Sequence, residues 1–409
     1  MGLDMKSYQI SLLLGAGAGA ALVPQAALAQ SAEVFGDFRA RFETVEQTGK
    51  LDADSLTVRS RVGVRFKPAD DRFTFLAEAE NNITLSGDDR NTSLDPRPQF
   101  ATINDPDFTE LNRAQLTFSP DEAWSFTVGR QYIGFDGNRI IGSPGWRQDK
   151  NSYDAAVVNF ERGALEATYV YSWQLNRGPG TDFNWDMSSH LLNASVAVSP
   201  ALKLAGFVYL IDIEETGREN LSNTTFGARL TGSTEIGEFG VSYDLMVATQ
   251  TDSGSATASY DNTLIDSGVA FTRGGARFAL GYDVITGDGT FAFANPLAGN
   301  HGTAGWADVF HGGGRSSPPD GLEDFNVEVS YGASVESSAI EGWRAGLIWR
   351  DFSSENTGND LGEELDAYLR LSFANDVSLS FEMADYDGPD ASYAPADKTK
   401  YWVTLGYKF

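Results

Sequence analysis

The end of the chain, from Lys398 to Phe409, alternates between two kinds of side chain. Its apolar positions are Tyr401, Val403, Leu405, Tyr407 and Phe409, and the positions between them are Lys400, Trp402, Thr404, Gly406 and Lys408. A period of two residues is the period of a β-strand. An apolar strand left at the edge of a sheet promotes aggregation, because its backbone groups remain unpaired. We therefore expect the last strand to pair with the first one and to close a ring.

The same alternation recurs from Glu33 onward, in segments of about ten residues that are each followed by a turn. In one of them, Val58, Val62 and Val64 alternate with Arg59 and Arg61. Hydrophobic residues make up only 41% of the chain, which suits a membrane barrel because only one face of each strand meets lipid. A secreted β-sandwich is the alternative, but the nearly uniform spacing over one long domain favours a closed barrel.

The connections between these segments alternate between short and long. Segment 119–123 is a short one and segment 286–322 is the longest. Eight short and nine long connections predict an all-β fold, a transmembrane antiparallel β-barrel of about 18 strands. In such barrels the short turns are periplasmic and the long loops extracellular, so we expect both ends of the chain in the periplasm.

The amino-terminal segment has the pattern of a cleaved secretory signal peptide. Lys6 precedes an apolar run from Ile10 to Val23, and Ala27-Leu28-Ala29 matches the cleavage site. The run is too short to span about 30 Å of hydrocarbon as a helix. We predict a signal peptide over residues 1–29 and an outer-membrane β-barrel over 30–409, placed in the outer membrane of a Gram-negative cell.

Composition excludes several other functions. The net charge of −27 argues against nucleic acid as a partner, and the absence of Cys excludes disulfides and thiolate metal sites. Acidic residues crowd the long loops, and a minority of them could bind divalent cations through their carboxylates. None of these loops has the spacing of a calcium-binding loop, so we assign no metal site, and we predict no cofactor. With three His and no G-x-S-x-G nucleophile turn, the chain is not expected to be an enzyme, and we assign no catalytic residue.

On the lumen side, opposite the apolar face, alternation places a set of Arg residues. They are Arg39, Arg41, Arg59, Arg61, Arg65, Arg113, Arg229, Arg344, Arg350 and Arg370. Guanidinium groups match carboxylates and would form an anion path of many weak sites, so we predict a net positive constriction. In the alternative, acidic residues of the same face pair with them and brace the wall. These are Glu43, Glu78, Glu80, Asp244, Asp283, Glu328, Asp366 and Glu382.

Two blocks, 111–154 and 281–331, carry more than periodicity. The first contains Gly-Arg-Gln ending at Gln131, Asp-x-x-Arg ending at Arg139, and Trp-Arg-Gln from Trp146 to Gln148; the second contains His301 and Gly-Trp-Ala-Asp ending at Asp308. Together these blocks resemble the alginate-export family of outer-membrane barrels. The resemblance implies an eighteen-stranded, Arg-lined channel for an acidic polysaccharide.

The resemblance also implies site residues. Those expected at or near the constriction are Arg130, Gln131, Arg139, Trp146, Arg147 and Gln148. Those expected in an inward or capping loop are His301, Trp306 and Asp308. Alternation places Arg130 on the lipid side with Phe126 and Val128, so either a bulge intervenes or Arg130 lies at the rim.

We therefore expect a channel for passive passage of anionic solutes, in particular uronate-type saccharides. Its expected partners are outer-membrane lipid and lipopolysaccharide, the anionic solute and a periplasmic export scaffold. A general diffusion porin is the first alternative, and it would lack any response to uronate oligomers. A plugged barrel that binds or hydrolyses ligands at the surface is the second, and it would conduct almost no current.

Overall fold

The computed structural model describes residues 29–409, apart from 70, 300, 311–317 and 336–338. The predicted signal peptide therefore lies almost wholly outside the described residues. Three single-turn 3₁₀ helices, Asp136–Asn138, Thr181–Phe183 and Glu219–Leu221, are the only helices of the described part, and none of its helices is long and apolar enough to cross a membrane. The strands are β1 (Ala29–Gln47), β2 (Ala53–Pro68), β3 (Phe73–Ser86), β4 (Phe108–Phe118), β5 (Trp124–Gln131), β6 (Ser152–Arg162), β7 (Leu165–Asn176), β8 (Trp185–Ser199), β9 (Leu202–Ile211), β10 (Asn223–Ile236), β11 (Phe239–Asp252), β12 (Asp261–Arg273), β13 (Ala276–Ile285), β14 (Leu322–Ser334), β15 (Ile340–Ser353), β16 (Asp360–Phe373), β17 (Val377–Asp387) and β18 (Lys398–Lys408).

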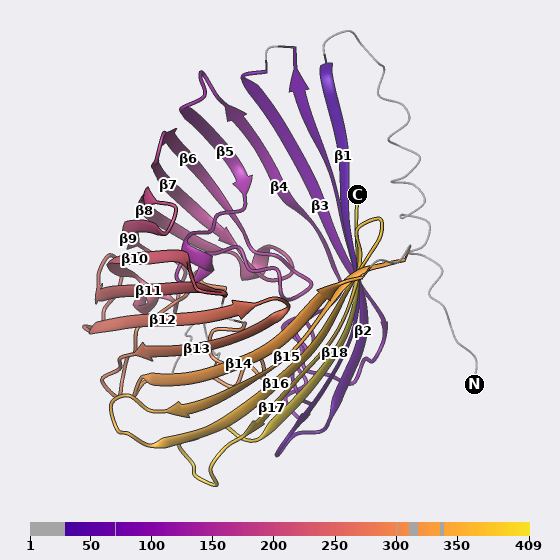
Figure 1. Cartoon of the computed structure of the whole chain (residues 1–409), viewed down its shortest axis with the longest axis vertical. Coiled ribbons are helices and arrows are strands. Elements are labelled where there is room, and N and C mark those ends of the chain that lie inside the picture. Colours follow the sequence, from indigo (N-terminus) through magenta and orange to yellow (C-terminus); the bar gives the residue numbers. More distant parts are fainter. Residues whose placement is uncertain (1–28, 70, 300, 311–317, 336–338) are drawn as a thin grey trace.

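These strands form one closed antiparallel ring of 18 strands (Figure 1), as predicted. Every strand pairs with its neighbours in sequence, and β18 pairs with β1 in the register Phe38↔Tyr407. Backbone hydrogen bonds continue the pairing to the end of the chain, from Gly36 N to Phe409 O at 3.0 Å and from Phe409 N to Gly36 O at 3.1 Å. Closure removes the free edge that the last strand would otherwise present.

The outer surface of the ring is apolar, as the alternation predicted. In β18, Tyr401, Val403 and Leu405 are exposed on the outside, whereas Lys400 and Trp402 are 0% and 1% exposed on the inside. Large apolar side chains are exposed along strands all around the ring. A continuous apolar exterior of this kind is stable against lipid rather than against water.

The connections also follow the prediction, with short turns at one end of the ring and long loops at the other. The turns 163–164, 237–238 and 274–275 have only two residues each. Each begins with a Gly at positive φ, such as Gly163 at 64°, a conformation that costs other residues more. The long end includes the connections 87–107, 132–151 and 286–321.

The interior is less polar than alternation predicted. A buried apolar cluster joins the inner face of β6–β9 to the two loops 132–151 and 286–321. Tyr153, Leu191 and Ile141 are each 0% exposed within it. Because these loops bring apolar side chains into the ring, the wall that they contact is apolar on its inner face too.

Candidate functional site

The loop 132–151 between β5 and β6 enters the ring instead of extending outward (Figure 1). It turns sharply at Asp136, Gly137 and Asn138, which all have positive φ (50°, 74° and 64°). A side chain at Gly142 would lie 2.6 Å from the Asn138 Cβ, so Gly is required for the return of the chain. Phe135 then stacks on Tyr209 of β9 with a centroid distance of 6.0 Å. The loop therefore packs against the apolar wall on one side.

On its other side, the Trp146–Gln148 segment is held by β1. Arg39 donates to the Gly145 carbonyl at 2.8 Å and to Gln148 Oε1 at 2.7 Å. Arg41 donates to the Trp146 carbonyl at 2.6 Å, and its guanidinium lies 4.2 Å from the Trp146 ring centre. Within the described part of the chain, neither Arg39 nor Arg41 forms an ion pair. These two positive charges therefore hold backbone carbonyls, which neutralise less charge than carboxylates would.

Arg147 fixes the same segment through carboxylates. It donates to both oxygens of Glu43 at 3.0 and 2.8 Å. It also lies 3.6 Å from Asp105 and 3.8 Å from Asp308. Glu43 and Asp105 are 1% and 2% exposed. Arg147 thus connects β1 with three separate long loops.

The loop 286–321 between β13 and β14 supplies a second inward segment, 301–308. His301 stacks on Trp146 at a centroid distance of 3.7 Å and contacts Asp308 through Nδ1 at 3.0 Å. Lys400 donates to Asp308 Oδ2 at 2.7 Å. Trp306 is held at its backbone N–H, which donates to the Glu364 carboxylate of β16. The predicted loop residues His301, Trp306 and Asp308 therefore lie inside the ring, next to Trp146 and Arg147.

Two cavities flank this segment. The loop-end cavity has a volume of 880 Å³ and is lined by Trp146, Arg147, His301 and Asp308 together with residues of the long loops. The strand cavity has a volume of 470 Å³ and is lined by the inner faces of β11–β15 and by Gly302 and Thr303. Since His301 and Asp308 face one cavity and Gly302 and Thr303 face the other, the 301–308 segment separates them.

The buried His301 predicts a pH response. Burial lowers its pKa below the ordinary value of 6.5; Asp308 acts in the opposite sense, while Lys400 and Arg147 add to the lowering. The folded segment therefore binds fewer protons than the unfolded one, so its stabilisation is full above pH 6.5 and is lost as the pH falls through the folded pKa. We expect single-channel conductance to rise on acidification, as a charged His301 leaves Trp146.

Conductance traces recorded between pH 8 and pH 4.5 would check this. His301→Gln should flatten the response, whereas His190→Gln should keep it, because His190 is exposed on the outer face of β8. A His301→Gln barrel with the full pH response would contradict the assignment.

Most of the predicted Arg residues on the inner wall are paired with acids, as the bracing alternative expected. All eight acidic residues named for that alternative contact a basic side chain. The pairs are Glu43–Arg147 (2.8 Å), Glu78–Arg113 (2.7 Å), Glu80–Arg61 (3.8 Å), Asp244–Arg229 (2.8 Å), Asp283–Arg139 (3.8 Å), Glu328–Arg277 (3.2 Å), Asp366–Arg350 (3.5 Å) and Glu382–Arg370 (2.7 Å). The wall therefore carries charges of both signs, and a net positive constriction stays a prediction.

The remaining predicted Arg residues lie in different surroundings. Arg59 pairs with Asp37, and Arg65 pairs with Glu33 at 2.6 Å near the short-turn end. Arg344 donates to the Ser330 hydroxyl at 3.2 Å and lines a small cavity at that end. Its guanidinium is thus held by a neutral partner.

Arg130 does not lie at the constriction that the family resemblance implied. It pairs in register with Ala114 and Asp154, on the face of β5 that carries Phe126 and Val128. Its guanidinium binds the Asp154 carboxylate through Nε at 2.8 Å and Nη2 at 3.1 Å. The alternation was right, and the position near the end of β5 corresponds to the rim. Gln131 faces inward instead, and its amide donates to the Ala155 carbonyl at 3.0 Å.

Four basic residues of the loop-end cavity were missed by sequence reasoning: Arg177, Arg218, Lys398 and Lys400. The Arg177 guanidinium lies 4.1 Å from the Trp185 ring centre, and its buried Nη1 has no hydrogen-bond partner. Burial, with Arg218 nearby, lowers the Arg177 pKa to about 10, so it stays charged at neutral pH. Lys400 could have been found, because it lies on the inner face of an already predicted strand, whereas Arg177 and Arg218 belong to loops without periodicity.

The inward loops and the two cavities define the class as a closed 18-stranded barrel whose lumen is narrowed from within. Known structures share this fold. Pseudomonas aeruginosa OpdK with vanillate matches with a TM-score of 0.69 at 12% identity, over 93% of this chain and 99% of that one. P. aeruginosa OccK9 (OpdG) matches with a TM-score of 0.69 at 13% identity, and Acinetobacter baumannii OccAB4 matches with a TM-score of 0.67 at 14% identity. Each match covers 93% of this chain and 98% of the other.

The TM-scores over nearly the full length of both chains establish a shared fold. OpdK is described as an outer membrane protein in another of its structures. No family model and no curated protein sequence matches the chain. The eighteen-stranded barrel that the alginate-export resemblance implied is thus confirmed, whereas membership of that family is not shown.

Proposed function

We propose that this protein is an outer-membrane channel for the passive passage of small anionic solutes, above all carboxylates. The apolar exterior of the ring supports a membrane location, and the predicted signal peptide supports export. The structural neighbour OpdK, described as an outer membrane protein and solved with vanillate, supports the same location and solute class.

The observation that carries the proposal is the charge of the loop-end cavity. Five basic residues line it, against four acidic ones: Arg147, Arg177, Arg218, Lys398 and Lys400 against Asp149, Asp182, Glu215 and Asp308. Arg147 and Lys400 are already bound to carboxylates. Among the described residues, neither Arg177 nor Lys398 forms an ion pair or a side-chain hydrogen bond. A solute carboxylate entering the cavity would supply the missing partner, because a guanidinium fork binds carboxylates through two parallel hydrogen bonds.

The test is ion selectivity in a planar bilayer under a salt gradient. The wild-type barrel should prefer anions, and Arg177→Ala with Lys398→Ala should lower the anion-to-cation permeability ratio at least about fivefold, since even one charge contact is worth ~1 kcal/mol in water-like surroundings. Arg273→Ala is the matched control, because Arg273 is exposed and pairs with Glu238 at a short turn. Cation preference in the wild type, or a double variant with the wild-type ratio, would refute the proposal.

The finer proposal concerns uronate-type saccharides, which carry one carboxylate per sugar. A cavity of 880 Å³ has the size of typical small-molecule sites, and the family resemblance points to uronates. Blockade of the current by oligomannuronate would support this finer proposal. Blockade by vanillate without any effect of oligomannuronate would support small aromatic acids as the solutes instead. If neither compound blocks the current, the general diffusion porin is the hypothesis that remains.

A further inference from the structure

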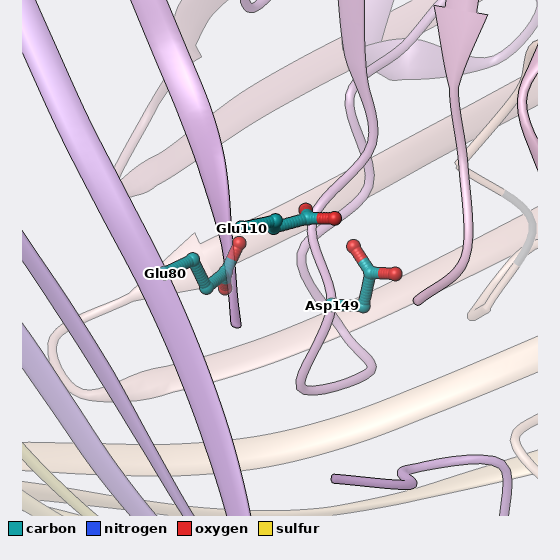
Figure 2. A group of neighbouring side chains, drawn as sticks. All are labelled: Glu80, Glu110 and Asp149. Atoms are coloured by element: carbon teal, nitrogen blue, oxygen red, sulfur yellow. The ribbon is translucent and has the colours of Figure 1, made fainter. Parts of the chain in front are cut away.

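Three carboxylates from separate parts of the chain meet beside the inward loop (Figure 2). Glu80 lies on β3 and Glu110 on β4, where the two residues are register partners, and Asp149 follows the Trp146–Gln148 segment. Oxygen atoms of all three lie within 4.8 Å of one another. Like charges this close repel strongly unless a cation or protons neutralise them. The contact brings the loop 132–151 against the charged wall.

A neighbouring side chain provides an independent sign of a missing ligand. Asn112, also on β4, is 0% exposed, and its Nδ2 contacts Glu80 Oε2, so its amide reaches into the cluster. Its Oδ1 is buried without any hydrogen-bond partner. Glu80 Oε1 and Asp149 Oδ2 are buried without one as well. Buried oxygens of three different side chains thus lack a donor, and unsatisfied groups of this kind call for a bound water or ion.

The basic residues nearby neutralise the cluster only in part. Arg59 and Arg61 approach Glu80 only to 3.9 and 3.8 Å, and both bind Asp37 more closely. The Arg130 guanidinium is already bound to both oxygens of the Asp154 carboxylate. Burial raises the pKa of Asp149 well above its ordinary value, and Glu110 and Glu80 raise it further. Three ionised carboxylates are therefore more stable with a positively charged ligand bound between them than without one.

We propose that Glu80, Glu110 and Asp149 bind one hard divalent cation, with Asn112 Oδ1 as a neutral ligand. Calcium fits this set better than magnesium, because it accepts several oxygen ligands in flexible geometry, whereas magnesium demands a near-ideal octahedron. The cation would join β3 and β4 to the loop directly after Gln148. It would thereby fasten the inward loop to the wall at a second point, separate from its apolar contact with β9.

The test uses the whole barrel, refolded in detergent without lipopolysaccharide and stripped with a chelator. Calcium titrated by calorimetry should bind at one site per barrel and raise the thermal unfolding midpoint. Glu110→Gln and Asp149→Asn should each weaken binding at least tenfold. Glu215→Gln and Asp182→Asn should bind as the wild type does, because both acids line the loop-end cavity outside the cluster.

Heat-modifiable migration verifies that each variant is folded before titration. Terbium luminescence on the wild type provides a measurement that needs no variant, and calcium should displace terbium while sodium should not. Absence of saturable calcium binding, terbium that calcium fails to displace, or wild-type affinity in the folded Glu110→Gln and Asp149→Asn variants would each overturn the proposal.

Discussion

Replacing Arg147 with Ala is expected to produce the largest functional change of any single substitution in this barrel. The variant would leave Glu43 and Asp105 buried without their shared guanidinium. Removing one partner of a buried ion pair costs about 3–5 kcal/mol, because the remaining charge stays desolvated. The Trp146–Gln148 segment would then keep its hydrogen bonds to Arg39, Arg41, Asp105 and Thr57 and the stacking of Trp146 on His301, but it would lose all of its ion pairs in the described residues. We expect a lower free energy of unfolding in urea, together with larger and noisier single-channel currents as the loop 132–151 moves.

Two further variants separate the charge of Arg147 from its geometry. Arg147→Lys keeps the charge but lacks the planar fork, so its stability should fall between those of the wild type and Arg147→Ala. Adding Glu43→Gln to Arg147→Ala should restore part of the loss, because it removes a stranded carboxylate. If Arg147→Ala unfolds and conducts as the wild type does, Arg147 does not hold the loop.

Arg350→Ala is expected to have the largest effect on stability outside the inward loops. Arg350 on β15 is 5% exposed and binds Asp324, with Asp366 at 3.5 Å. These two acids are 1% and 0% exposed. Arg350 also donates to the Gly302 carbonyl at 3.2 Å, so it anchors the 301–308 segment. A loss of about 3–5 kcal/mol is expected from breaking this buried pair, and urea denaturation would measure it.

Arg344→Ala is the matched control for this experiment. Arg344 lies on the same strand and the same inner face, but its recorded partner in the described residues is the neutral Ser330 hydroxyl. A neutral hydrogen bond contributes about 0.5–1.5 kcal/mol, so the control should lose far less stability. Equal losses in the two variants would show that the buried carboxylates near Arg350 do not depend on it.

The sequence could predict the ring because strand period and turn spacing are local properties. The alternation placed Arg59, Arg113 and Arg350 on the inner face and Arg130 on the outer one, as the structure has them. The sequence of β6 also indicates the apolar inner wall, although the prediction from alternation did not take this pattern into account. Residues 155–158 read Ala-Ala-Val-Val, and a strand that is apolar at consecutive positions is typically buried on both faces.

The contacts that build the candidate site could not be predicted in the same way. Arg147 and Glu43 are 104 residues apart, and no period relates a loop to the strand that it touches. The carboxylate cluster is of the same kind, since Glu80, Glu110 and Asp149 belong to three segments. The absence of a calcium-loop spacing therefore had no bearing on a site assembled from distant parts.

The buried apolar cluster gives the β6–β9 side of the ring a tolerance to change that differs from that of the β1–β4 side. On the β6–β9 side, the outer and the inner faces of the strands are both apolar. A polar side chain introduced on the outer face would contact lipid, and one introduced on the inner face would contact the cluster. On the β1–β4 side, ion pairs and backbone carbonyls hold the interior, and a charged residue can be exchanged together with its partner without opening a void. Substitutions that change the interior charge would therefore be accepted mainly on the β1–β4 side, provided that both partners of an ion pair change together. Two barrels with this architecture could differ widely in their interior charge and still assemble alike.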